Sequence, residues 1–181
     1  MTQQDIMMAG LRNFAEHGYE GASMAMIADA VGIKKQSIYT HFKNKDALFL
    51  AVCEECITQE MDFIQMVIES QQNYKELFER YIARYQHNAA TKFWLRMMFF
   101  PPQHLYDEVM DGVYRYLDAV EELATDMFAM AETVTRDVPP TILAQSYLAL
   151  LDSIFVELLY GDSERAHRRL EAAYTVFARG I

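Results

Sequence analysis

The chain has 181 residues, of which 52% are hydrophobic, and a net charge of −10. This length allows a small and a medium-sized folding unit, and the few glycines and prolines favour a compact helical protein. No run of uncharged apolar residues is long enough to span a membrane, and the N-terminus lacks a basic region and a cleavage site. We therefore expect an all-α cytoplasmic protein with no membrane partner.

The first predicted helix runs from about residue 3 to His17. Thr2 and Asp5 have the spacing of an N-terminal capping pair, and apolar residues recur along one side of the segment. Gly18 is expected to end this helix in a left-handed cap, because glycine adopts positive φ without a steric penalty.

Two short helices are predicted next. Ser23 caps the first and Gly32 ends it, whereas the second runs from Lys35 to about Phe42. Apolar residues recur at the spacing that packs two such helices across each other, namely Ile27, Ala28, Val31, Ile33, Ile38 and Phe42. Two crossed helices joined by a glycine-containing turn form the helix-turn-helix arrangement, whose second helix enters the major groove of DNA.

These residues resemble the N-terminal signature of the TetR family. The matching segments are GY at 18–19, IA at 27–28, VGI at 31–33, the K-x-S-I-Y run at 35–39 and HFKNKDALF at 41–49. The rest of the chain is similar to the family only in length and helical character. The resemblance implies a three-helix DNA-binding domain at 1–48 and a helical effector-binding and dimerisation domain at 49–181. It also implies a homodimeric repressor that a small molecule releases from a palindromic, double-stranded operator.

We expect the DNA contacts to come mainly from the second short helix. The lysines in its first turn can donate to guanine, and the glutamine can pair with adenine. The hydroxyl groups that follow can also reach bases. The resemblance implies that Tyr39, His41 and Lys45 contact phosphates. The predicted DNA-binding set is Ser23, Lys34, Lys35, Gln36, Ser37, Tyr39, Thr40, His41 and Lys45. One departure is the apolar run 24–26, where relatives often place a polar or basic residue that contacts a base.

The net negative charge does not oppose DNA binding, because it is unevenly distributed. Residues 1–50 hold five basic and five acidic side chains, and four of those five bases fall within 34–45. The whole acidic excess therefore lies beyond residue 50. A local basic patch is enough for phosphate contacts.

The remainder of the chain is predicted to be helical throughout. A long helix begins near Lys45 and carries two apolar stripes, which suits a connector with neighbours on both sides. The later helices are expected at 74–88, 91–100, 105–127, 140–159 and 163–177. Pro101-Pro102 ends the second of these, because proline disfavours helical geometry in the residue before it. The last two are expected to form the dimer interface, because apolar residues cover more of the 143–159 circumference than one contact needs. The alternative is that 143–159 is the core helix of a monomer.

Aromatic residues and methionines gather at 92–102, and such side chains form adaptable walls for apolar ligands. The same stripe at helical spacing is more often ordinary core packing. Asp152 shares a stripe with apolar residues, and a buried carboxylate needs a partner, which is either a cationic ligand or an arginine. A hydrophobic effector, cationic or neutral rather than anionic, is therefore expected. The predicted ligand-binding set is Phe63, Tyr85, Trp94, Met97, Met98, Phe100, Tyr114, Asp152 and Phe155.

Other chemistry is sparse in the sequence. Cys53 and Cys56 form a C-x-x-C within a predicted helix, where two packing cysteines are the better interpretation, although a thiol sensor stays open. No catalytic motif, metal-ligand spacing or phosphate-binding loop is found, so we expect no enzyme, cofactor or metal. Two alternatives to a ligand-released repressor remain. One is a DNA-binding regulator controlled by a protein partner or thiol oxidation, and the other is a small-molecule carrier or helical enzyme.

Overall fold

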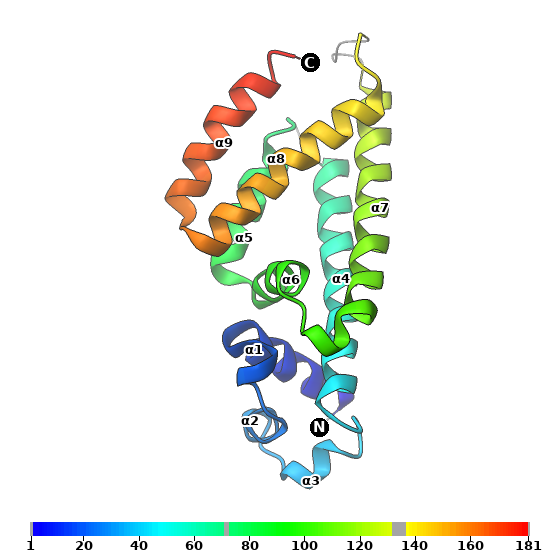
Figure 1. Cartoon of the computed structure of the whole chain (residues 1–181), viewed down its shortest axis with the longest axis vertical. Coiled ribbons are helices and arrows are strands. Elements are labelled where there is room, and N and C mark those ends of the chain that lie inside the picture. The colour runs from blue at the N-terminus through cyan, green and yellow to red at the C-terminus, as the bar shows by residue number, and fades with distance from the viewer. Residues whose placement is uncertain (1, 71–72, 132–136, 181) are drawn as a thin grey trace. The chain divides into compact units, whose positions relative to one another are not determined.

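The computed structural model describes residues 2–70, 73–131 and 137–180. Within these ranges the chain is entirely helical (Figure 1), which confirms the predicted fold class. In chain order the helices are α1 (Gln3–Gly21), α2 (Met24–Ala30), α3 (Lys35–Ile38), α4 (Lys45–Ser70), α5 (Glu76–His87), α6 (Ala89–Phe99), the 3-10 helix η1 (Gln103–Leu105), α7 (Tyr106–Met130), α8 (Pro140–Tyr160) and α9 (Ser163–Phe177).

The contacts divide the chain into two compact units. The first unit comprises Met1–Glu60 and Asn88–Tyr114, and the second comprises Met61–His87 and Arg115–Ile181. The first unit therefore contains α1, α2, α3 and α6 together with the beginning of α4. The predicted domain boundary between residues 48 and 49 falls within α4 and stays a prediction.

The N-terminal cap of α1 forms as predicted. The Asp5 backbone N–H donates to Thr2 Oγ1 at 3.1 Å, and the Thr2 backbone N–H donates to the Asp5 carboxylate at 2.7 Å. Gly18 interrupts the helix with φ 70° and ψ 178°, a combination that is essentially restricted to glycine. The chain then continues for another turn to Gly21, so Gly18 is a break within α1 rather than its final left-handed cap.

Two short helices follow α1. Ser23 accepts a hydrogen bond from the Met26 N–H at 3.2 Å and so caps α2, as predicted. The α3 helix ends at Ile38, which is earlier than the predicted Phe42. The N–H groups of His41 and Phe42 both donate to the Ile38 carbonyl at 3.1 Å, so this segment is a tight turn that still satisfies its backbone.

Within the first unit, α6 packs on α1 and is also held by α4. Asn88 caps α6 by accepting from the Thr91 N–H at 3.0 Å. The Thr91 hydroxyl donates to the buried Glu60 carboxylate at 3.1 Å, and the Cys56 thiol donates to the Ala90 carbonyl at 3.2 Å. These two bonds fix the beginning of α6, and Pro101-Pro102 follows its other end.

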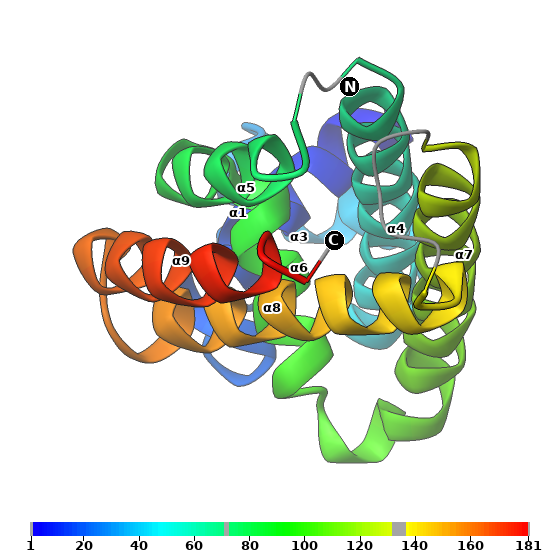
Figure 2. The same cartoon turned by 90° about the horizontal axis from the view of Figure 1, so that it is seen from above.

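The second unit is built around α5, α8 and α9, with α8 and α9 running side by side (Figure 2). Its core is aromatic: the rings of Phe78 and Tyr147 lie 4.7 Å apart, and those of Phe128 and Tyr147 lie 5.6 Å apart. The Tyr147 hydroxyl donates to the Tyr74 carbonyl at 2.6 Å. Buried aromatic rings with a hydrogen-bonded polar tip therefore join α5 to α8.

Among the described helices, α8 is long and apolar enough by length and composition to cross a membrane. Buried residues make up 44% of its most apolar window. Its buried side chains include Leu143, Tyr147, Ile154 and Leu158, and a core helix of a water-soluble protein passes the same test. The composition of α8 is therefore weak support for a membrane span.

Candidate nucleic-acid interface and ligand pocket

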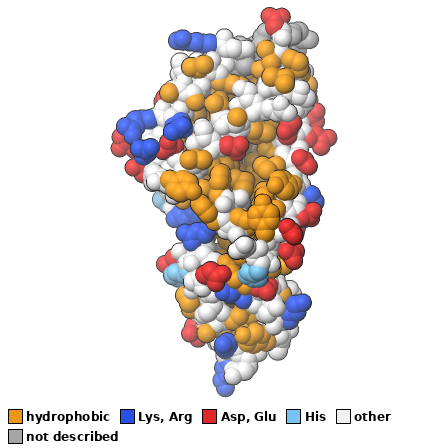
Figure 3. All heavy atoms as spheres, in the orientation of Figure 1, with side chains coloured by type: hydrophobic (Ala, Val, Ile, Leu, Met, Phe, Trp, Pro, Cys, Tyr) orange, Lys and Arg blue, Asp and Glu red, His pale blue; other side chains and the backbone are white. Residues whose placement is uncertain are grey.

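The start of α3 presents polar and basic side chains to solvent. The side chains from Lys34 to Ser37 are all exposed, whereas Ile38 behind them is fully buried. Figure 3 shows basic side chains at the end of the first unit that carries α3. The phenol of Tyr39 and the imidazole of His41 are also exposed just after the helix. This surface has the donors and acceptors that base edges and phosphates require.

Two predicted contact residues already use their hydroxyl groups within the chain. The Thr40 hydroxyl donates to the Ser37 carbonyl at 2.7 Å. Ser23 Oγ serves as the α2 cap and is only partly exposed. Neither bond removes the remaining capacity of a hydroxyl group. Their contacts with DNA stay predictions.

Lys45 has a structural role that the sequence did not reveal. Its ammonium donates to the carbonyl oxygens of Tyr19 at 2.8 Å and Ala22 at 3.2 Å, and lies 4.0 Å from the centre of the Tyr19 ring. A cation is favourable at the C-terminal end of a helix, where carbonyl groups lack partners. Lys45 thus ties the beginning of α4 to the end of α1, and its phosphate contact stays a prediction.

A small polar cluster lies beside this lysine. The Tyr19 hydroxyl donates to the Asp46 carboxylate, and His104 Nε2 lies 3.2 Å from the Tyr19 hydroxyl oxygen and 3.3 Å from Asp46 Oδ1. The Tyr19 hydrogen bond, with help from His104, holds the pKa of Asp46 below its usual value. Burial and the nearby carboxylate raise the pKa of Tyr19. This cluster joins α1, α4 and η1 within the first unit.

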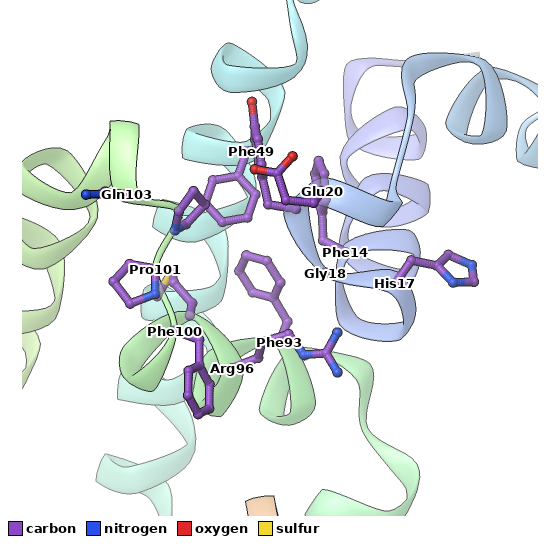
Figure 4. Close-up of a pocket in the computed structure, with 13 residues that line it drawn as sticks. Phe14, His17, Gly18, Glu20, Phe49, Phe93, Arg96, Phe100, Pro101 and Gln103 are labelled. Carbon is purple, nitrogen blue, oxygen red and sulfur yellow. The ribbon is translucent and has the colours of Figure 1, made fainter.

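A cavity of about 410 Å³ opens in the first unit (Figure 4), and we call it the α1–α6 pocket. Its walls come from the end of α1, the beginning of α4, and the end of α6 with the proline segment that follows. The lining residues are Phe14, His17, Gly18, Tyr19, Glu20, Phe49, Phe93, Arg96, Met97, Phe100, Pro101, Pro102 and Gln103. This volume is within the range of small-molecule binding sites.

Three phenylalanines form one wall of the α1–α6 pocket. The ring centres of Phe14 and Phe49 are 5.0 Å apart and those of Phe49 and Phe93 are 5.5 Å apart, both in edge-to-face geometry. These three rings are buried, whereas the Phe100 side chain is 53% exposed. The pocket therefore has an apolar interior and an accessible aromatic side chain.

The polar lining of the pocket includes one guanidinium group. Arg96 reaches from α6 toward Gly18 of α1 (Figure 4), and its Nη1 lies 3.3 Å from the position that a Cβ at residue 18 would take. His17 and Glu20 also line the pocket and are exposed. Within the described ranges, the Arg96 side chain makes no hydrogen bond or ion pair.

Only part of the predicted ligand-binding cluster in α6 faces this cavity. Met97 and Phe100 line it, together with Phe93 and Arg96, which share their face of the helix. Trp94 is fully buried and is not a lining residue, so its predicted place inside the pocket is wrong for this cavity. Met98 is half-buried on another side of α6. The contribution of α1 was not predicted from the sequence, because it follows from the packing of α1 against α6.

The other predicted ligand residues are distributed over both units. Tyr114 of the first unit is exposed. In the second unit, the rings of Phe63 and Phe155 each lie 5.0 Å from that of Tyr81, and Tyr85 is half-buried. These contacts place Phe63 and Phe155 in the core of that unit.

Asp152 corrects an expectation about charge. Its side chain is exposed in the single chain rather than buried, so it does not need a cationic partner. Surrounding atoms still remove enough water to raise the pKa of its carboxyl group. An exposed Asp152 therefore gives no support for a cationic effector.

The two cysteines are buried packing residues, as the favoured interpretation predicted. Burial raises the pKa of the Cys53 thiol, and the Cys56 thiol donates to the Ala90 carbonyl. Reactive cysteines are instead accessible and have lowered pKa values. No group of three or more His, Cys, Asp or Glu residues in the described part of the chain could hold a metal ion.

The family model "Bacterial regulatory proteins, tetR family" matches residues 6–52. This range covers most of α1, both short helices and the beginning of α4. The HTH-type transcriptional repressor AcnR of Corynebacterium diphtheriae is 44% identical over 55 residues, which are 30% of this chain and 29% of that protein. The N-terminal segment of the chain therefore belongs to the TetR family. This is a family of transcription regulators, so the prediction that the chain is not an enzyme is confirmed.

Solved TetR-family structures extend the similarity in fold to nearly the whole chain. A TetR transcription regulator from Haloarcula marismortui is similar with a TM-score of 0.79 and 21% identity, covering 99% of this chain and 97% of the other. The transcriptional regulator FadR of Bacillus subtilis, in complex with stearoyl-CoA, has a TM-score of 0.68 and 17% identity over 99% of this chain and 100% of that one. These likenesses concern the fold alone.

Proposed function

We propose that this TetR-family protein is a transcriptional repressor that binds a palindromic operator through α3. The observation that carries the proposal is the exposed polar face Lys34–Ser37, set on a buried Ile38 within a segment that matches the family model. Acting on chromosomal DNA requires a cytoplasmic location. The similarity to the repressor AcnR over 55 residues supports this function.

The working form is proposed to be a homodimer, because a single helix-turn-helix reads few bases and a palindrome needs two. On α8, the exposed apolar side chains Ile142, Val156 and Tyr160 recur on one side of the helix, and Val176 is exposed on α9. These residues support an interface through α8 and α9. Leu151 and Phe155 are instead buried inside the single chain, at 4% and 3% exposure.

Replacing Ile142 and Val156 with Glu therefore tests the interface without disturbing the core. Analytical ultracentrifugation should show a dimer for the unmodified protein and a monomer for this double variant, because uncompensated charge is costly in an apolar interface. Ala83→Glu, at an exposed position of α5, adds a charge outside the proposed interface and serves as the control for net charge. A monomeric unmodified protein at micromolar concentration would exclude the dimer.

The repressor is further proposed to respond to a small apolar effector. The B. subtilis FadR structure contains stearoyl-CoA, so this fold accommodates a ligand with a long apolar chain in that protein. In the present chain, the α1–α6 pocket supplies an apolar cavity in the same unit as α2 and α3. Thiol oxidation is the weaker alternative, because both cysteines are buried.

The decisive experiment is a gel shift with the intergenic DNA next to the protein's own gene. Saturable binding that survives competition by random DNA supports the repressor function. Adding apolar compounds to the bound complex then separates a ligand-released repressor from one that answers to a protein partner. Equal affinity for the intergenic and random duplexes would reject sequence-specific regulation.

A further inference from the structure

We propose that the α1–α6 pocket binds an aromatic molecule with a single carboxylate and that the bound molecule holds α6 against α1. This inference rests on the proposed function and identifies the class of effector and its site. The cavity of about 410 Å³ is large enough for a compact ring system. It also lies within one unit, so its walls are completed by a single chain.

The aromatic body follows from the shape of the apolar wall. Phe14, Phe49 and Phe93 meet in edge-to-face contacts and are buried. Such rings pack favourably against another aromatic ring in offset or edge-to-face geometry. Phe100 lines the pocket at the end of α6 and is half exposed, so its ring is accessible to a ligand. A flat apolar molecule matches these walls better than a polar one, which would lose its hydration inside.

The carboxylate follows from Arg96. A guanidinium group presents a planar fork of donors that matches a carboxylate with two parallel hydrogen bonds. Within the described ranges no ion pair or hydrogen bond occupies this side chain, and Gly18 lets it approach the α1 backbone closely. Glu20 is the acidic side chain of the lining. Its repulsion favours a ligand with one negative charge over a polyanion.

The regulatory consequence follows from the elements that form the walls. A ligand in this pocket contacts the end of α1, Phe49 of α4 and the end of α6 simultaneously. α1 also packs against α2, and α2 packs against α3. A ligand that prefers one α1–α6 arrangement shifts the position of the reading helices only to the extent of its differential affinity. Binding and operator affinity should therefore be coupled.

The first test measures binding directly, without DNA. Isothermal titration calorimetry, with emission from Trp94 as a second readout, compares naphthoate with naphthylmethylamine and the uncharged naphthalenemethanol. Naphthoate should bind most tightly. Decanoate, which has the same carboxylate on a flexible chain, tests whether the aromatic body matters. Equal binding of the amine, or failure of naphthoate to bind, would overturn the inference while leaving the operator result intact.

Two variants locate the site. Arg96→Gln should weaken naphthoate binding about 10-fold or more, since a charged hydrogen-bond pair contributes that much affinity, and Arg96→Lys should restore part of it. The matched control is Lys92→Gln, which removes one exposed positive charge from the same helix outside the pocket. Equal losses in Arg96→Gln and Lys92→Gln would indicate a general charge effect and refute the site.

The second test adds the operator. Saturating naphthoate should change operator affinity in the unmodified protein and leave it unchanged in Arg96→Gln. Phe100→Ala removes a ring that lines the pocket and should weaken naphthoate binding. Tight naphthoate binding with no change in operator affinity would overturn the proposed coupling.

Discussion

The two units contain aromatic clusters that differ in how their rings are held. In the second unit, Tyr147 stacks edge-on with Phe78 and also donates its hydroxyl to the Tyr74 carbonyl. In the first unit, Phe14, Phe49 and Phe93 contact one another through apolar edges and border a cavity. Tyr147 thus ties the rings of the second unit by a polar tip, whereas the three phenylalanines have none of their own and meet the hydrogen-bonded Tyr19 only at their edge.

This difference separates two uses of the same residue types. A buried tyrosine whose hydroxyl is already bonded fixes its ring and leaves no polar group for a ligand. Phenylalanine rings without such ties can adjust to an inserted molecule at little cost in hydrogen bonding. We therefore interpret the second cluster as structural and the first as a binding site.

The largest expected effect comes from truncating the structural cluster. Phe78→Ala should lower the free energy of unfolding by about 3–5 kcal/mol, because it leaves a cavity in a packed core. Urea denaturation monitored by circular dichroism measures this change. Phe100→Ala, with a ring of the same size that is half exposed, should change stability by less than about 0.5 kcal/mol. Similar losses in both variants would remove the distinction between the clusters.

The next effect concerns the reading surface and should leave stability unchanged. Lys35→Ala and Gln36→Ala should weaken binding to the operator more than to random DNA, by about 1–3 kcal/mol for a good base contact. Tyr39→Phe should weaken both duplexes evenly, because it removes a phosphate contact. Fluorescence anisotropy with both duplexes decides the matter. Identical ratios for all three variants would contradict these roles.

Lys45→Met should have a smaller effect, of about 1 kcal/mol, on the free energy of unfolding, because it leaves two carbonyl groups at the end of α1 without their charged donor. Lys43→Met, at an exposed position in the preceding turn, is the control and should have almost none. Salt dependence of operator binding distinguishes the second role: a smaller slope for Lys45→Met would indicate a phosphate contact as well. Full stability of Lys45→Met would exclude the tie between α4 and α1.

The smallest expected effect is a change in acid sensitivity. Asp46 has a folded pKa below its usual value, so its contribution to stability is present at neutral pH and is lost as the pH falls through that folded pKa. Tyr19→Phe removes the main hydrogen bond and should raise the pKa of Asp46 toward its ordinary value, as carboxyl carbon NMR titration would measure. The variant should then lose less stability on acidification. His104→Gln should cause a smaller rise of the same sign, since His104 is a lesser cause.

Much of the first unit was predictable because local chemistry determines it. Ser23, Gly18 and Gly32 carry their signals in residue type alone, since capping and positive φ each favour few residues. The exposed face of α3 also followed from the spacing of its apolar residues. The end of α3 was predicted too late. The N–H groups of His41 and Phe42 still donate to the Ile38 carbonyl in the turn that follows, so the apolar spacing continues to Phe42 after the regular helix has ended.

The pocket could be predicted only in part, because it depends on contacts between segments far apart in the chain. Met97 and Phe100 were identified from the density of aromatic residues and methionines in α6. The composition of α6 alone did not indicate that its Phe93 and Arg96 side would face α1, or that Trp94 would point elsewhere. Asp152 was misjudged for a related reason: the stripe that contains it borders solvent in the single chain.

The two glycines with positive φ differ in how much space surrounds them. Gly18 and Gly32 both have φ near 70°, yet a Cβ at Gly32 would meet nothing within 4 Å, whereas one at Gly18 would press on Arg96. Alanine at Gly32 therefore reports backbone strain with little added steric cost. Alanine at Gly18 reports strain together with displacement of the guanidinium group. Because the ψ of 178° at Gly18 is itself specific to glycine, alanine at Gly18 should cost more than alanine at Gly32 on both counts.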